Sequence, residues 1–478
     1  MAIGRRDRMT QETMWIASSE IARSEGHVFY KALNRLFARH GFDGFVEKLV
    51  EGTEVFSSDV GRPSVPPGVY FRMSMVGYFE GLSSERGIAW RCADSMSLRE
   101  FLGYDLTRET PDHSTLSRWR RNLPEKVHRE VFEWVVTVAR KEGVLKGRRI
   151  AVDSTTMEAN AAMKSIVRRA DGVTYQEYLK KLARAEGIEN PTPQDLQRLD
   201  RRRRGKKASN KQWKSRTDAD ARIARMKDGR TRMAYKVENA TDVQSRITVA
   251  AEVHAADRGD PGTVGKTLRS ADEAVMNAGV EGGIQDVILD RGYHADSVLE
   301  ELQERGLRSY VAEPKRARRN WARQRRRDGA ERVARRQKAY YGNRRRSRGQ
   351  RGRSLQKLRA EYPERGFAHL KRTGGLARLW VRGKHEVRKK VHSYVAAANL
   401  GVILHTLLGM GTPRGLQSRL GEALAALFAS LRLVLARAVH DSDPRPAGRS
   451  FPPVPFRMAR IDVRPTIQVQ EWPSATGC

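Results

Sequence analysis

The 478-residue chain has only two cysteines, Cys92 and Cys478, which leaves neither a disulfide framework nor a cysteine-based zinc site. Its longest apolar stretches are interrupted by Asn399, His405 and Arg432, too early for a membrane-spanning helix. The arginines near the N-terminus are followed by no apolar core, so no signal peptide is expected. These absences predict a cytoplasmic protein that does not act at a membrane.

Acidic residues are also scarce relative to basic ones. The chain has 56 Asp plus Glu and 91 Lys plus Arg, a formal net charge of +35. An excess of this size indicates a polyanionic partner, and nucleic acid is the obvious one.

One short segment combines an apolar run with an acid and a glycine. Val287, Ile288 and Leu289 lead directly into Asp290, and Gly292 follows. The run predicts a buried strand, and Gly292 permits a tight turn or a close backbone approach. Asp290 alone would suit a helix cap, but it also stands at the carboxyl end of a strand, where open α/β sheets hold ligands.

The same arrangement occurs earlier, where the apolar residues 150–152 lead into Asp153. A third carboxylate, Glu364, begins a predicted helix and shares one helical face with Lys371, seven residues later. Carboxylate oxygens gathered at one point in a basic protein predict a magnesium site for phosphate chemistry.

These motifs resemble those of bacterial insertion-sequence transposases of the DDE type, which have a ribonuclease-H-like catalytic domain. The resemblance extends from about His27 through the segment at 411–415. Related transposases share a signature of Tyr, two residues, Arg, three residues, Glu, six residues, Lys. Glu364 and Lys371 match it, whereas Lys357 and Ala360 stand in the Tyr and Arg places, with Arg359 one place off.

The resemblance implies an α/β fold with a ribonuclease-H-like mixed sheet, preceded by an all-α N-terminal DNA-binding domain. The expected strands are 150–153, 233–237, 247–253, 287–290 and 309–312, with the second and third paired antiparallel and a helix from 260 to 278. The expected domains are 1–145, 146–373 with basic insertions at 160–230 and 314–358, C-terminal helices at 374–440, and a Pro-rich tail at 441–478.

The resemblance also implies a mechanism in which Asp153, Asp290 and Glu364 hold two Mg²⁺ ions, with Mn²⁺ as a substitute. Asp153 would bridge the ions because the family's first aspartate lies on the central strand. The expected reaction is hydrolysis at the element's ends followed by transfer of the freed 3′-hydroxyls to target DNA. The implied partners are double-stranded DNA, as element ends and target, and a second copy of the chain in the DNA complex.

Apolar residues at helical spacing predict an N-terminal helical domain, with a helix-turn-helix-like part near 86–123. A cluster at 110–115 offers several caps for a basic helix carrying Arg118, Arg120 and Arg121. A basic exposed face of an ordinary helical bundle would look the same. Trp90 and Trp119 are expected to be core residues rather than base-stacking ones.

The insertions carry further candidates for DNA binding. Between Lys315 and Arg353 there are 18 basic and 2 acidic side chains, a local charge of +16. Such a run is expected to form no core and to be extended or partly helical, either as a DNA-contacting arm or as a solvated tract. For residues 160–230, a solvated helical arm and a DNA-binding arm are equally compatible with the sequence. The predicted DNA contacts in the basic run are Arg319, Trp321, Arg325 and Arg345.

Trp321 is expected either to pack on the catalytic domain near Tyr310 or to stack on an unpaired base. On the predicted helix of Glu364, Lys371 would meet a phosphate as a point charge, and Arg365 is a weaker candidate for the same role. His294 and His369 fit structural roles better than proton shuttling.

Three alternatives stay open. The chain could be another metal-dependent nuclease of the same fold, such as a junction resolvase. It could be a DNA-binding regulator without catalysis, although a regulator has no reason to keep the acidic triad. It could also be an inactive remnant of an element, given Lys357 and Ala360. The end and target sequences, a hairpin intermediate and the oligomeric state are not determined by sequence.

Overall fold

The computed structural model describes Ile21, Ser24 and residues 26–53, 65–203, 209–315 and 319–413. The predicted apolar stripe at 423–434, the Pro-rich tail at 441–478 and part of the basic run at 201–207 lie outside these residues.

The first part of the chain is helical, as predicted. Its helices are α1 (Val28–Arg39), α2 (Phe42–Glu51), α3 (Pro67–Phe79), α4 (Glu85–Asp94), α5 (Met96–Leu102), α6 (His113–Asn122) and α7 (Glu125–Lys141). In α1 the predicted stripe Phe29, Leu33 and Phe37 is buried. α3 is buried along almost its whole length, so it is a central helix of this part rather than an amphipathic surface one.

A mixed sheet follows, as the ribonuclease-H-like interpretation predicts. Its strands are β1 (Arg149–Glu158), β4 (Arg222–Arg225), β5 (Thr231–Asp242), β6 (Thr248–Ala255), β7 (Asp286–Leu289) and β8 (Arg308–Val311). β6 and β5 pair antiparallel, β5 and β1 pair antiparallel, and β1, β7 and β8 are parallel. β4 pairs with the start of β5. The five predicted strands are therefore all present, and β1 and β5 are both longer than expected.

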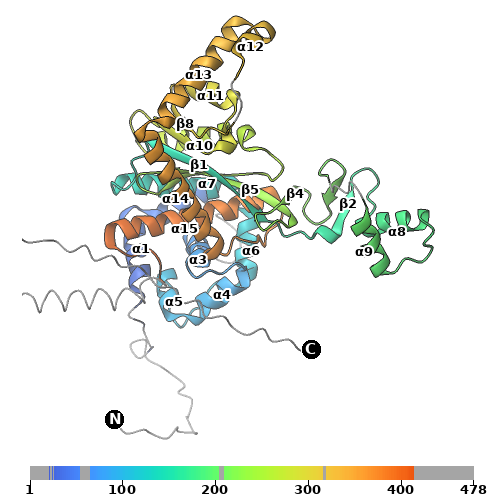
Figure 1. Cartoon of the computed structure of the whole chain (residues 1–478). Helices are drawn as coiled ribbons and strands as arrows, with labels where there is room; N and C mark the ends of the chain where they lie inside the picture. Colours follow the sequence, from blue (N-terminus) through green and yellow to red (C-terminus); the bar gives the residue numbers. More distant parts are fainter. Residues whose placement is uncertain are drawn as a thin grey trace, which may run out of the picture. The chain divides into compact units, whose positions relative to one another are not determined.

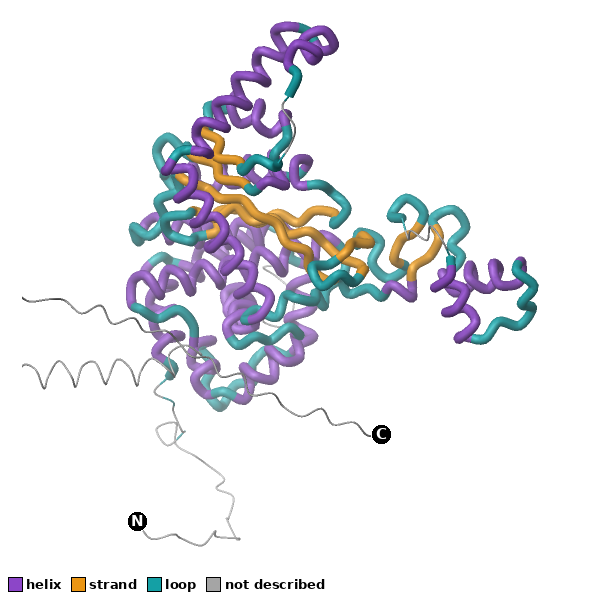
Figure 2. The backbone as a smooth tube through the Cα atoms, in the orientation of Figure 1, coloured by secondary structure: helices purple, strands orange, loops and turns teal. Residues whose placement is uncertain are grey.

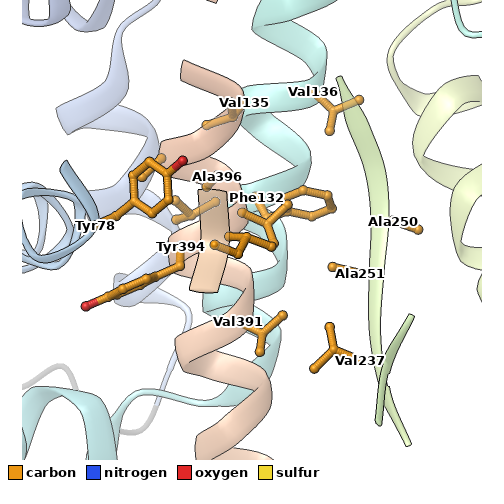
Figure 3. Packing of buried hydrophobic residues seen from close by; sticks show 14 of the residues in the cluster. Tyr78, Phe132, Val135, Val136, Val237, Ala250, Ala251, Val391, Tyr394 and Ala396 are labelled. Atoms are coloured by element: carbon orange, nitrogen blue, oxygen red, sulfur yellow. The ribbon is translucent and has the colours of Figure 1, made fainter. Parts of the chain in front are cut away.

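Helices cover both faces of this sheet (Figure 2). They include α10 (Val264–Asn277), α11 (Asp296–Glu304), α14 (Gln350–Arg372) and α15 (Lys384–Leu408). Val237 and Ala251 point toward α15 and α7, whereas Ala250 points to the opposite face, where α10 contacts β6 (Figure 3). This alternation follows from the two-residue period of a strand.

The first insertion contains a small helical module (Figure 1). Its elements are β2 (Ile166–Arg168), α8 (Tyr175–Ala185), α9 (Pro193–Arg202) and β3 (Trp213–Ser215). α8 coincides with the helical spacing seen in the sequence. Leu179 and Ala183 pack against Leu196 and Leu199 in a satellite core, so part of this insertion folds as a unit of its own.

The second insertion is helical, one of the two forms expected for the basic run, but part of it is buried, which corrects the expectation that the run forms no core. It forms α12 (Trp321–Asp328), α13 (Ala330–Arg348) and the start of α14. Val333 and Ala339 are buried, and the buried Asn343 pairs with the main chain of Val311 at the end of β8. Acidic residues outside the run pair with some of its arginines, which a count of charges within the run does not include. Arg344, for example, pairs with Glu313.

α15 joins the helical part to the sheet. It packs against α7, α3 and β6, and Tyr394 meets Tyr78 of α3 while its hydroxyl donates to the carbonyl of Leu82 (Figure 3). By length and composition α15 is the one helix in the described residues apolar enough to cross a membrane, yet 67% of its apolar window is buried. Burial of this kind identifies it as a core helix.

Candidate active site

Asp153 and Asp290 are brought together by the parallel pairing of their strands. Ala151 of β1 lies opposite Ile288 of β7. Continuing that register by two residues places Asp153 opposite Asp290, on neighbouring strands that are about 4.8 Å apart. The strand-end pattern of the sequence therefore corresponds to a real juxtaposition of two carboxylates.

A single guanidinium lies between these carboxylates. Arg359 Nη2 of α14 is 2.8 Å from Asp153 Oδ1 and 3.5 Å from Asp290 Oδ2. Burial raises the pKa of Asp153 above its ordinary value, Arg359 lowers it, and the charge of Asp290 raises it. The Asp153 carboxylate is thus held between a second acid, which disfavours its ionisation, and a cation, which favours it.

Glu364 lies within α14 and does not begin it, although the sequence suggested that it would. Along the helix it stands between two cations that contact β1. Arg359 reaches Asp153, and Lys371 Nζ donates to Thr155 Oγ1 at 2.7 Å. Thr155 lies two residues beyond Asp153 and therefore on the same face of β1. Glu364 is exposed, and within the described part of the chain its carboxylate has no hydrogen bond or ion pair.

The loop after β7 fixes the Asp290 carboxylate. Asp290 is the N-cap of a short 3₁₀ helix, η3 (Arg291–Tyr293), and its Oδ1 accepts from Gly292 N at 2.7 Å. A Cβ on Gly292 would lie 2.8 Å from Asp260 Oδ2 and 3.0 Å from Asp290 Oδ1. Gly292 therefore serves the close approach that the sequence suggested, and Asp290 caps η3 rather than the helix that follows it.

A buried polar network lies on the opposite face of the sheet from Asp153. Lys236 of β5 is 7% exposed, and its ammonium lies 2.6 Å from Asp260 Oδ1 and 3.5 Å from Glu238 Oε1. Ser154 Oγ donates to Asp260, and the Tyr293 hydroxyl donates to Glu238 at 2.9 Å. The network thus ties the residue after Asp153 to the loop after Asp290, and it holds both strand ends in place.

The Asp153 and Asp290 pair has the oxygen chemistry that Mg²⁺ prefers, and it already surrounds a positive charge. The residues present therefore fit a divalent cation. In the described residues no three His, Cys, Asp or Glu side chains stand close enough together to hold one ion. The place of Glu364 in a three-carboxylate site stays a prediction.

The predicted helix-turn-helix region contains α4, α5 and α6. Asp112 caps α6, its carboxylate accepts from Thr115 N at 2.7 Å, and this bond lowers the pKa of Asp112 to about 2. Arg118 and Arg121 are exposed on α6. Arg120 instead bonds Glu85 and Glu386, which ties α6 to α4 and α15.

The expectation for the two tryptophans of this region is half right. Trp119 is partly buried and stacks on Tyr70, with ring centroids 6.2 Å apart. Trp90 is 68% exposed, so its assignment to the core is wrong. α4 buries Ile88, Ala89 and Cys92 on one side, and Trp90 falls on the opposite side of the helix, which meets solvent.

The candidates in the basic run differ in exposure. Arg319 is an anchor: it pairs with Asp296 at 2.6 Å, and its guanidinium lies 4.3 Å from the centroid of the Tyr340 ring. Trp321 packs within the insertion, against Tyr340 and Tyr341, and not near Tyr310. A further set of basic side chains is exposed and has no acidic partner in the described residues: Arg323, Arg325, Arg326, Arg332, Arg335, Lys338 and Arg345.

The other sequence candidates are placed as follows. Arg365 is exposed and pairs with Glu361 one helical turn away. His294 is buried and packs against the Tyr340 ring, which fits a structural histidine. Burial lowers the pKa of His369. Burial also lowers the pKa of Lys371, and the charge of Lys227, in the turn between β4 and β5, lowers it further.

Sequence reasoning missed several residues of this site. The sequence presents Arg359 only as a displaced match to the signature, because its contacts depend on how α14 crosses β1. Lys236 and Glu238 did carry a signal: two charged residues flank Val237 in the middle of the strand, just after the apolar residues 233–235. Such a pattern in a central strand indicates buried charges that must pair with one another.

The comparison with known proteins gives two matches. Residues 145–400, more than half of the chain, match the family model described as Transposase DDE domain. Residues 19–122 match the model described as Transposase domain (DUF772). No curated protein matches the chain. The first region contains β1, β7 and α14, and with them Asp153, Asp290 and Glu364.

Proposed function

We propose, from the premise that this chain belongs to the insertion-sequence DDE transposase family, that it cuts element ends and joins them to target DNA with Asp153, Asp290 and Glu364. The family is a family of DNA transposases and depends on a divalent metal. The observation that carries the proposal is the meeting of Asp153 and Asp290 around one cationic point at the carboxyl end of parallel strands.

Asp153, Asp290 and Glu364 would hold two Mg²⁺ ions, for which Mn²⁺ can substitute, and the ions would supply positive charge for the attacking and leaving oxygens. Asp153, on the central strand, would contact both ions, and Asp290 and Glu364 would each contact one. Arg359 would leave the carboxylates and turn its guanidinium toward the DNA phosphate. Lys371 would meet a phosphate oxygen after releasing Thr155.

The proposed chemistry needs no external energy source. A water oxygen forms a bond to phosphorus, the bond to the 3′ oxygen breaks, and that oxygen leaves as a hydroxyl. The hydroxyl oxygen then attacks a phosphodiester of the target. One phosphodiester is formed and one is broken, and the target's own 3′ oxygen takes up the proton.

The test is to incubate the purified protein with DNA that carries its element ends, a target plasmid and Mg²⁺. We expect cuts that leave 3′-hydroxyls at the ends, followed by joined products, and neither when EDTA removes the metal. Sequencing of the products locates the cuts and the joints. Cutting without any joining would identify a nuclease instead, and no cutting with either Mg²⁺ or Mn²⁺ would refute the proposal.

We assign the DNA contacts to exposed cations rather than to paired ones. Arg118 and Arg121 are exposed on α6 and have no acidic partner in the described residues, and Arg325 and Arg345 are exposed on the helices of the second insertion. Arg120 and Arg319 would support these surfaces through their ion pairs. The domain boundaries at 145 and 373, and a homodimer in the DNA complex, belong to the same proposal.

Trp321 is proposed to stack on an unpaired base beside the cut. Its side chain is partly exposed, and its indole N–H donates to the Tyr341 hydroxyl. The ring is therefore fixed in position while part of its surface stays accessible to a base. Stacking contributes about 1–3 kcal/mol per base. With 2-aminopurine at the terminal nucleotides, Trp321→Ala is expected to reduce the fluorescence change and slow cleavage. Identical responses in wild type and variant would assign Trp321 to packing alone.

A further inference from the structure

A basic hollow lies at the end of the sheet where β1, β7 and β8 begin. Its volume is about 370 Å³. Arg149 of its lining precedes Asp153 on β1 by four residues, which corresponds to about 13 Å along a strand. The hollow is therefore separate from the carboxylate pair and lies toward the opposite ends of the same strands.

Six cationic side chains from several elements line this hollow. They are Arg140, Lys146, Arg148, Arg149, Arg308 and Arg351. Glu281 is the acidic side chain of the lining, all of which belongs to the described residues. So many like charges around one concavity repel one another, because the walls exclude part of the water that would screen them.

A buried carboxylate beneath the hollow organises three of these cations. The side chain of Asp286 is 1% exposed and lies 2.5 Å from Arg308 Nε, 2.5 Å from Arg351 Nη2 and 3.6 Å from Arg149 Nε. One negative charge thus holds three positive ones. Each guanidinium has five N–H donors, so most of their donors are left for a ligand.

Two more cations have no acidic partner. Arg140 is near the end of α7, and Arg148 precedes β1. Neither side chain has a hydrogen bond or ion pair in the described part of the chain. The main-chain carbonyl of Arg148 accepts from Gln285 N and Asp286 N, so its backbone position is fixed while its guanidinium stays available.

We propose that this hollow binds the phosphate backbone of duplex DNA, away from the phosphodiester that is cut. Phosphate oxygens match the planar donor pairs of arginine. Among its lining residues Val280 is the one apolar side chain and there is no aromatic ring. The hollow can therefore recognise phosphate but offers no surface for a base, which fits a backbone contact better than a free nucleotide. The proposal rests on the assignment of DNA as the substrate.

The test uses the full chain and no divalent metal. The double variant Arg140→Gln/Arg148→Gln removes the two unpaired cations and leaves the Asp286 ion pairs intact. The matched control is Arg35→Gln/Lys48→Gln, which removes two exposed cations of α1 and α2 that also have no acidic partner in the described residues. Binding of a long duplex is measured by fluorescence anisotropy across a range of salt concentrations.

The log–log salt slope is expected to fall by about 1.8 in the double variant, at about 0.9 per lost phosphate contact, and to stay at the wild-type value in the control. Equal slopes in all three proteins would overturn the proposal. In a second arm, inorganic tripolyphosphate is titrated into each protein. If wild type binds it, the double variant does not, and DNA slopes are equal, the hollow takes small anions and not DNA. Because no metal is present, these results are independent of whether the protein cuts DNA.

Discussion

Asp290→Ala is expected to lower the rate of DNA cleavage by roughly 10³-fold or more, because it removes one of the three carboxylates that would hold the metal ions. DNA affinity measured without metal should stay the same or increase, because the substitution removes a negative charge from a basic surface. Asp290 is 35% exposed, so stability should change little.

The matched control for this variant is Asp272→Ala. Asp272 is 37% exposed and pairs with Arg305 at 3.4 Å, but it lies on α10 and outside the carboxylate pair. The Asp272→Ala variant should cleave DNA at the wild-type rate. Cleavage by Asp290→Ala within tenfold of wild type would remove Asp290 from the catalytic assignment, whatever its DNA affinity.

Lys236→Met is expected to destabilise the fold by about 3–5 kcal/mol, the usual effect of breaking a buried ion pair by removing one partner. Glu238 is 0% exposed, and Lys236 is the cation 3.5 Å from it. Chemical denaturation monitored by circular dichroism measures the free energy of unfolding. Lys266→Met, which removes a half-exposed partner of Glu252, should change it by less than about 1 kcal/mol.

The same variant should gain a particular pH dependence. Burial raises the pKa of Glu238 and Lys236 lowers it, so without Lys236 the pKa rises further. A raised pKa means that the folded state binds the proton more tightly than the unfolded state does. The stability of Lys236→Met should therefore fall as pH rises from the ordinary glutamate range through the folded pKa. If Lys236→Met lost as much stability at acidic pH as at neutral pH, the loss would not come from a charged Glu238 left without Lys236.

Much of the fold followed from local pattern. The strand before Asp153 and the strand before Asp290 are where the apolar runs place them, and because parallel strands end at one edge, their carboxylates meet. The capped basic helix after Asp112 was also predictable from its first turn. In each case the information lies within a few residues of sequence.

What the local pattern could not show is chiefly contacts between distant segments. The run from Lys315 to Arg353 forms packed helices because Glu313 and other acids outside the run pair with its arginines. Arg120, predicted as a DNA contact, pairs with Glu386, which is 266 residues away in sequence. A charge count over neighbouring residues cannot include such partners.

The position of α15 has a consequence for how the chain is made. α3 is synthesised early, and Tyr78 at its end packs on Tyr394, more than 300 residues later. Until α15 leaves the ribosome, this almost wholly apolar helix lacks one of the surfaces that bury it. Contacts so far apart in sequence slow folding and leave apolar surface open to other chains. We therefore expect the nascent N-terminal helices to expose apolar surface until α15 is made, and a chain truncated before Lys384 to aggregate.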